Sequence, residues 1–127
     1  MIFHRFASQK ERRKFGGSAF IEIQFCRLPV GMPADKLVAD ISHWKNDSLY
    51  VQGESDFYIE YGHLLDCGIY GNLESGIVDV WGINYYAPFT IDSIIEKLNR
   101  DKPTEYEVFA AWLSKAKQYN GFYILGM

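Results

Sequence analysis

The stretch N-G-F-Y-I-L-G at residues 120–126 decides the fold that we expect for this chain. Asn120 and Gly121 form a pair that often ends a helix, because both residues enter the left-handed backbone region at low cost. Residues 122–125 are all apolar, which is typical of a strand that is buried on both faces. Such a strand lies inside a sheet, so we expect it to pair with strands from earlier parts of the chain.

Two helices are predicted before this strand, over residues 90–100 and 104–119. Thr90 is expected to cap the first helix with its hydroxyl group. Thr104 and Glu107 match a capping box, in which each side chain bonds a backbone N–H of the other residue. The apolar residues of each helix recur at the spacing of one buried face. They are Ile91, Ile94, Ile95 and Leu98 in the first helix, and Phe109, Trp112, Leu113 and Ala116 in the second.

The earlier part of the chain is rich in predicted strands. Apolar and polar residues alternate over 19–25, which predicts a half-buried strand, and a helix is predicted over 33–45, where it begins at a proline. A segment dominated by Tyr, Phe, Ile, Val and Gly follows and has a β composition. Its predicted strands are 48–52, 56–61, 66–70 and 77–86.

Two connections in this segment are predicted from their turn residues. Residues 72–76 have the composition of a turn, so 67–71 and 77–83 are expected to pair as an antiparallel hairpin. Residues 61–65 fit either a bulge or a short helix.

This order of elements predicts the α+β class, with a single antiparallel or mixed sheet and about three helices packed mostly on one face. Residues 18–127 are expected to form one domain, because a chain of 127 residues is too short for two ordinary domains. Residues 1–17 are expected to be a basic arm, since Gly16 and Gly17 interrupt any regular element there.

The distribution of charge says more than the net charge of −3. The first fifteen residues carry five basic side chains and a single acidic one, Glu11, whereas residues 46–96 contain nine carboxylates and no Lys or Arg. Such a span is ordinarily a solvated surface, but it also produces a negative field that steers basic partners. Nucleic acid is not expected as a direct ligand of this span, because phosphate binding needs cationic side chains.

Motifs for catalysis, metal binding and cofactors are not found. The spacing of His4, His43 and His63 matches no zinc signature, and the sequence contains neither a nucleophile elbow nor a phosphate loop. Cys26 and Cys67 belong to no C-x-x-C pair and are expected to be buried free thiols. With no signal peptide or membrane-spanning run visible, we expect a non-enzymatic protein of the reducing cytoplasm without metal or cofactor.

The segment I-V-D-V-W-G-I-N-Y-Y at residues 77–86 has the composition of either a central strand or an interface. Asp79 would lie on an apolar row, where a carboxylate is costly to bury unless it is paired or hydrogen-bonded. An acid among Trp and Tyr is also typical of a protein-binding hot spot. Asn84, Tyr85 and Tyr86 fit both interpretations equally.

Three tracts resemble those of small bacterial immunity proteins of contact-dependent growth inhibition and related polymorphic toxin systems. They are Y-G-N-L at 70–73, W-G-I-N-Y-Y at 81–86 and N-G-F-Y-I-L-G at 120–126. The resemblance implies a cytoplasmic protein that binds one cognate toxin domain, commonly a nuclease, and blocks it. An acidic surface is compatible with this expectation, because an enzyme that handles nucleic acid has a cationic cleft.

The leading hypothesis is therefore a toxin-neutralising protein that contacts a basic nuclease domain, and neither a membrane nor nucleic acid directly. The first alternative is a ligand-binding or enzymatic domain with an aromatic pocket between sheet and helices. The second is a nucleic-acid accessory protein that uses the arm around Arg12, Arg13 and Lys14. The predicted contact residues of the leading hypothesis are Asp47, Glu54, Asp56, Glu60, Asp66, Tyr70, Glu74, Asp79, Asn84, Tyr85 and Tyr86.

Overall fold

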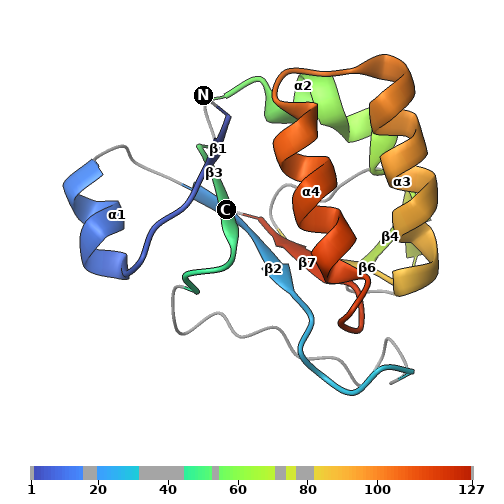
Figure 1. Cartoon of the computed structure of the whole chain (residues 1–127), viewed down its shortest axis with the longest axis horizontal. Coiled ribbons are helices and arrows are strands. Elements are labelled where there is room, and N and C mark those ends of the chain that lie inside the picture. Colours follow the sequence, from blue (N-terminus) through green and yellow to red (C-terminus); the bar gives the residue numbers. More distant parts are fainter. Residues whose placement is uncertain are drawn as a thin grey trace.

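The computed structural model describes residues 2–15, 20–31, 45–52, 55–70, 74–76 and 82–126 (Figure 1). Its strands form one sheet in the order β1-β3-β2-β7-β6-β4-β5, and all neighbouring strands are antiparallel. The strands are β1 (Phe3–His4), β2 (Phe20–Phe25), β3 (Leu49–Gln52), β4 (Gly68–Tyr70), β5 (Glu74–Gly76), β6 (Ile83–Tyr86) and β7 (Phe122–Leu125). The α+β class and the antiparallel sheet are confirmed.

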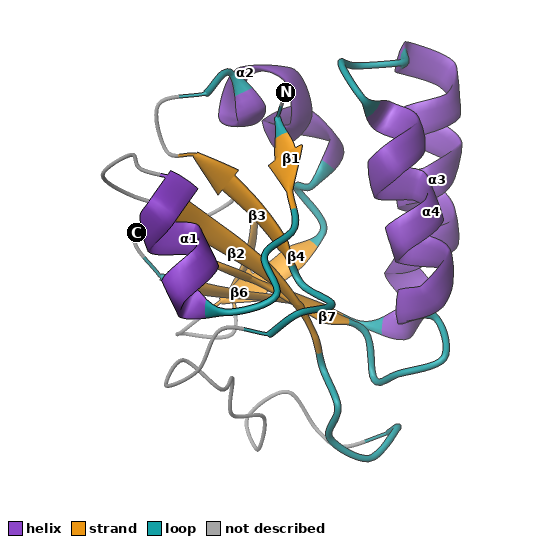
Figure 2. Ribbon diagram, turned by 60° about the vertical axis from the view of Figure 1, so that its left-hand side comes forward, coloured by secondary structure: helices purple, strands orange, loops and turns teal. Residues whose placement is uncertain are grey.

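Four α-helices lie in the described part of the chain, where about three were expected in the whole. They are α1 (Gln9–Phe15), α2 (Phe57–Tyr61), α3 (Pro88–Asp101) and α4 (Tyr106–Ala116), and a 3-10 helix, η2 (Gly62–Leu64), continues α2. Figure 2 shows α3 and α4 on one side of the sheet and α1 on the other. The predicted helix over 33–45 falls on residues that are not described, apart from Lys45, which is not helical.

Strand β7 is the central strand of the sheet, as its apolar sequence predicted. It pairs with β2 on one side and with β6 on the other, and all four of its residues are buried. Gly121, directly before it, has a φ of +82°, and a β-carbon there would collide with the carbonyl oxygen of Tyr86. The residue before β7 therefore has to be a glycine.

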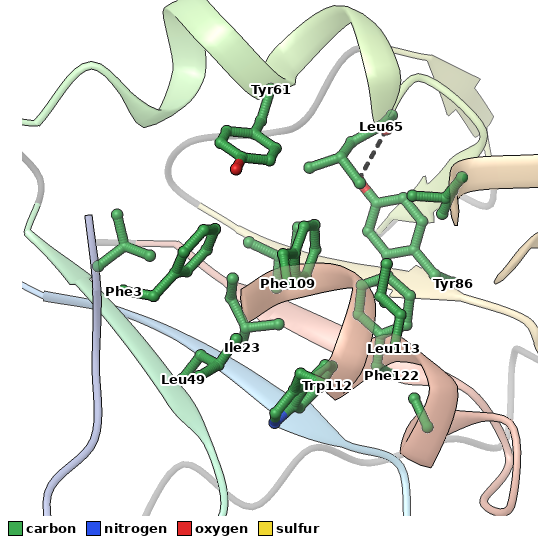
Figure 3. Close-up of a cluster of buried hydrophobic side chains, with 14 of the residues drawn as sticks. Phe3, Ile23, Leu49, Tyr61, Leu65, Tyr86, Phe109, Trp112, Leu113 and Phe122 are labelled. Atoms are coloured by element: carbon green, nitrogen blue, oxygen red, sulfur yellow. Dashed lines mark hydrogen bonds between the residues drawn. The ribbon is translucent and has the colours of Figure 1, made fainter. Parts of the chain in front are cut away.

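The main core lies between the sheet and helices α2, α3 and α4 (Figure 3). Phe109, Trp112 and Leu113 of α4 project onto Ile23 of β2 and Phe122 of β7 and are fully or almost fully buried. The ring of Trp112 stacks on that of Phe25 with the centroids 4.1 Å apart. Aromatic side chains bury large areas, so this layer supplies much of the hydrophobic stabilisation.

The predicted strand over 56–61 is wrong, because these residues form helix α2. Phe57 and Tyr61 are fully buried, whereas Ile59 is 79% exposed. In a strand all three side chains would share one face, but the helical spacing of four residues buries the first and last and turns Ile59 outward. The ambiguous residues 61–65 contain η2, so the helical alternative holds there.

The pairing predicted for β4 also differs. Its hairpin partner is β5, with Gly68 opposite Gly76, so part of the expected turn at 72–76 is a strand. On its other edge β4 pairs with β6, with Ile69 opposite Tyr85. The rest of that turn, and residues 77–81 of the expected partner strand, lie outside the described part of the chain.

Both predicted helix caps differ from the structure. Ala87 is the N-cap of α3, and Thr90 lies inside the helix and donates a hydrogen bond to the Ala87 carbonyl at 2.7 Å. Helix α4 begins after Glu105, which has a φ of 60° and makes no side-chain cap. The predicted capping box is therefore absent, because the hydroxyl and N–H of Thr104 bond to Glu60 instead.

A capping interaction is found instead at the start of α1. Ser8 Oγ accepts a hydrogen bond from the N–H of Glu11 at 3.2 Å, and the Glu11 carboxylate accepts one from the N–H of Ala7 at 3.0 Å. The residues expected as an arm thus contain a helix, and β1 before it joins the sheet beside β3. Ile2 and Phe3 belong to the main core.

Candidate functional site

Two of the predicted contact acids are paired with cations from outside the acidic span. Asp47 forms an ion pair with Arg27, and an oxygen of Asp66 lies 3.5 Å from Lys97 Nζ. The backbone carbonyl of Asp47 also accepts a hydrogen bond from Trp112 Nε1 at 2.8 Å. The negative field of residues 46–96 is therefore weaker than their lack of Lys and Arg suggests, because the fold brings cations from flanking segments to these two acids.

Acids with exposed apolar neighbours lie where α2 meets the start of α4. We call this surface the α2–α4 patch and define it as Asp56, Ile59, Glu60, Glu107 and Val108. Ile59 is 79% exposed and Val108 41% exposed, so both elements contribute apolar surface to the patch. Among the described residues, no cation forms an ion pair with Asp56, Glu60 or Glu107. The patch therefore combines apolar surface with negative charge that these residues leave uncompensated.

Thr104 joins the two elements of the patch. The Glu60 carboxylate accepts hydrogen bonds from the Thr104 N–H at 3.0 Å and from its hydroxyl at 2.7 Å. Tyr61 donates a third bond from its hydroxyl to the Thr104 carbonyl at 2.5 Å. The two bonds to its carboxylate lower the pKa of Glu60 below its ordinary value, so Glu60 stays ionised in mildly acidic solution.

Glu105 fixes the N-terminal strand behind the patch. Its carboxylate accepts hydrogen bonds from the backbone N–H groups of Ile2, at 2.7 Å, and Phe3, at 3.3 Å. The Phe3 ring then lies against the rings of Tyr61, at 5.4 Å between centroids, and Phe109, at 5.3 Å. These contacts tie the segment before α4 to the N-terminal strand and to the aromatic core.

The carboxylates near Tyr61 change the pKa of its hydroxyl. Burial raises the pKa of Tyr61 well above its ordinary value, and the negative charges of Glu60, Glu105 and Glu107 raise it further. Three carboxylates from two parts of the chain thus raise the pKa of one phenol. This concentration of negative charge favours a cationic partner at this end of the molecule.

The predicted anchors of β6 are buried and occupied by intramolecular contacts. Tyr86 donates from its hydroxyl to the Leu65 carbonyl at 2.8 Å, as Figure 3 shows, and stacks on Phe122 with centroids 4.6 Å apart. Tyr85 donates to the Asn120 carbonyl at 2.8 Å. Asn84 donates from Nδ2 to the Ile124 carbonyl at 3.0 Å. Asn84 thus joins β6 to β7, and the two tyrosines join β6 to the segments at Leu65 and Asn120, which fits the core interpretation of these three residues.

The other predicted contact residues are only partly described. Glu54 and Asp79 lie outside the described residues. Tyr70 and Glu74 are described by their backbone alone and lie opposite each other in the β4–β5 pair. Of the predicted set, Asp56 and Glu60 belong to the α2–α4 patch.

Sequence reasoning missed Ile59, Glu107 and Val108 as surface residues. Ile59 was assigned to a strand, and Glu107 was assigned to a capping box. The sequence offers no usable signal for this, because Phe57, Ile59 and Tyr61 fit the period of a strand as well as that of a helix.

A second polar cluster lies away from the patch, around Glu22 of β2, and was also missed. Glu22 accepts hydrogen bonds at Oε2 from Ser48, at 2.7 Å, and from Gln24, at 3.2 Å, and the Tyr50 hydroxyl, which donates to the Lys45 carbonyl at 2.7 Å, lies 3.4 Å away. Burial raises the pKa of Glu22 above its ordinary value, although these hydrogen bonds and Lys45 oppose that shift. The donors are side chains of the protein itself, so the cluster satisfies a half-buried acid without needing a ligand.

The two cysteines are free thiols, with Cys26 buried and Cys67 half-buried. Within the described residues, no group of three or more His, Cys, Asp or Glu side chains is placed to hold a metal ion. None of the described helices has the length and apolar character needed to cross a membrane. Comparison of the chain with protein-family models, with curated proteins and with solved structures gives no match.

Proposed function

We propose that this protein is an immunity-type inhibitor, which binds a basic toxin domain through the α2–α4 patch and thereby blocks it. The observation that carries the proposal is the position of Ile59, an aliphatic side chain that is 79% exposed between Tyr58 and Glu60 on a helix. An exposed apolar group beside carboxylates without a cationic partner among the described residues fits an interface with an apolar centre and a charged rim.

The chemistry of the partner follows from the charge of the patch. Nuclease domains carry cationic clefts for phosphates, and carboxylates held at fixed positions can occupy such a cleft in place of nucleic acid. The carboxylate of Glu60 is held in place by Thr104, and Glu107 is exposed on α4. Preorganised acids lose little side-chain entropy on binding, so they support tight inhibition.

The test uses the purified protein and the toxin domain encoded by the neighbouring gene, with inhibition of nuclease activity and binding kinetics as readouts. Ile59→Ser is expected to raise the dissociation rate about tenfold or more, because an apolar anchor at an interface centre chiefly slows release. The matched control is Phe89→Ser, which removes a similarly exposed apolar side chain from α3, 84% exposed, and should leave the rate unchanged.

The charged rim is tested separately. Glu107→Gln is expected to lower the association rate, and more strongly at low salt, because screening acts over roughly 10 Å at about 0.1 M salt. Glu96→Gln, which removes an exposed acid from α3, is the control. If Ile59→Ser has the same dissociation rate as Phe89→Ser, and Glu107→Gln the same association rate as Glu96→Gln, the contact surface lies elsewhere. If the wild-type protein neither binds nor inhibits the toxin, the proposed function itself is wrong.

A further inference from the structure

Helix α1, which is rich in basic residues, lies on the face of the sheet opposite α3 and α4 (Figure 2). We define the α1 surface as Arg5, Lys10, Arg13, Lys14 and Phe15. Its four cations are exposed, and so is the Phe15 ring, at 52%. The remaining basic residue of α1, Arg12, is half-buried and lies over the Phe20 ring at 4.3 Å.

Aromatic contacts fix the α1 surface to the sheet. The buried ring of Phe6 lies 5.6 Å from Phe15, 5.5 Å from Phe20 and 5.5 Å from Tyr50, measured between centroids. The first turn of the helix is capped by local hydrogen bonds between Ser8, Glu11 and Ala7. Because Phe15 and Arg12 pack against the sheet side and the backbone of α1 is helical, its cations have a defined spacing, unlike those of a flexible arm.

The cations of the α1 surface are not neutralised by the described part of the fold. No described carboxylate lies within ion-pair distance of Arg5, Lys10, Arg13 or Lys14. By contrast, Arg27, Lys97, Arg100 and Lys117 each have an acidic partner. The only acid of α1, Glu11, is engaged by the N–H of Ala7. Such cations are available to an anionic ligand without the cost of breaking an ion pair.

We propose that the α1 surface binds single-stranded nucleic acid, with the cations on consecutive phosphates and the Phe15 ring stacked on a base. Single strands are bound by proteins that combine cationic side chains with exposed aromatic rings, since every base has a flat face. An acidic protein could also contact both the cations and the ring, so an acidic polypeptide is the competing ligand in the test. The site is independent of the α2–α4 patch, because it lies on the other side of the sheet and has the opposite charge.

The test measures fluorescence anisotropy of a labelled twelve-nucleotide RNA with the full chain over a series of salt concentrations. Arg13→Gln/Lys14→Gln is compared with Lys102→Gln/Lys115→Gln, which removes the same charge from exposed positions elsewhere. For the α1 variant, the salt dependence of the logarithm of affinity is expected to fall by about 0.7 for each phosphate that the variant no longer neutralises. The control variant should keep the wild-type slope.

Phe15→Leu tests stacking, because it keeps an apolar side chain against Phe6 but removes the aromatic face. It is expected to weaken RNA binding about tenfold, the loss typical of one stacked base. Thermal midpoints establish that each variant is folded. Equal RNA affinity of the two charge variants overturns the proposal, as does wild-type protein that binds polyglutamate but not RNA, which would indicate an acidic protein partner. An unchanged affinity of Phe15→Leu overturns the stacking contact.

Discussion

Glu60 and Thr104 are joined by two hydrogen bonds across 44 residues of sequence, at 3.0 Å to the Thr104 N–H and 2.7 Å to its hydroxyl. The connection between α3 and α4 contains two non-glycine residues with positive φ, Lys102 at 49° and Glu105 at 60°. Such conformations are costly and persist only where the surrounding contacts enforce them. The bonds from Glu60 are among the contacts that hold this connection in place.

Glu60→Gln is expected to lower the thermal midpoint at neutral pH, because an amide is a weaker acceptor than a carboxylate. The folded pKa of Glu60 lies below its ordinary value, so its contribution to stability is present above the ordinary pKa and is lost as the pH falls through the folded one. The difference between variant and wild type should therefore shrink in acid. Asp56→Asn is the control, since Asp56 makes no side-chain cap on the same helix. Equal effects of both variants would contradict the prediction.

Glu22 is expected to show the opposite pH dependence. Its folded pKa is raised, chiefly by burial, so its ionised form destabilises the native state, and the protein gains stability as the pH falls through that pKa. Glu22→Gln should remove this gain while retaining an oxygen that can accept from Ser48. Urea unfolding of both proteins from neutral pH down to the ordinary carboxyl pKa of about 4.3 measures it, because the gain falls between the folded pKa and the ordinary one. Parallel pH profiles of the two proteins would show that Glu22 is not perturbed.

Gly121→Ala and Gly31→Ala separate backbone strain from steric collision. Both glycines have positive φ, +82° and +90°, but a β-carbon at Gly31 meets nothing within 4 Å, whereas one at Gly121 collides with the Tyr86 carbonyl oxygen. We expect Gly31→Ala to cost about 1–2 kcal/mol through strain alone, and Gly121→Ala to cost about 2–4 kcal/mol through strain and overpacking. Chemical denaturation gives both values. Equal losses would mean that the end of β6 at Tyr86 moves aside freely.

Tyr86→Phe is expected to destabilise the fold by about 1–2 kcal/mol, because it leaves the buried Leu65 carbonyl without its hydrogen bond. The ring itself keeps its stacking on Phe122 and its close contact with Gly68. Binding kinetics with the proposed toxin partner should be unchanged, since Tyr86 is fully buried. A slower association or faster dissociation without loss of stability would instead indicate that Tyr86 reaches the partner.

The parts of the fold with strong local patterns were predictable from the sequence. The apolar residues 122–125 predicted β7 as an inner strand, and the spacing of Phe109, Trp112 and Leu113 predicted the buried face of α4. Helix α2 was not predicted, because five residues with Phe57, Ile59 and Tyr61 fit strand and helix periods equally well, and tertiary contacts decide between them.

The candidate site was harder to predict for the same reason. Glu60 and Asp66 look alike in the sequence, but one bonds to Thr104 and the other lies near Lys97, and both partners come from later segments. Charge compensation of this kind depends on the tertiary structure. Ser8 and Glu11, in contrast, follow the S-x-x-E pattern of a capping box and could have been found from the sequence.

The position of β7 has a consequence for synthesis of the protein. In the strand order, β1, β3 and β2 lie on one side of β7, and β6, β4 and β5 lie on the other, so β7 alone connects the two groups of strands. It pairs with β2, which leaves the ribosome about a hundred residues earlier. The apolar residues of β2 therefore stay partly uncovered until β7 has left the ribosome, and completion of the sheet depends on a long-range contact.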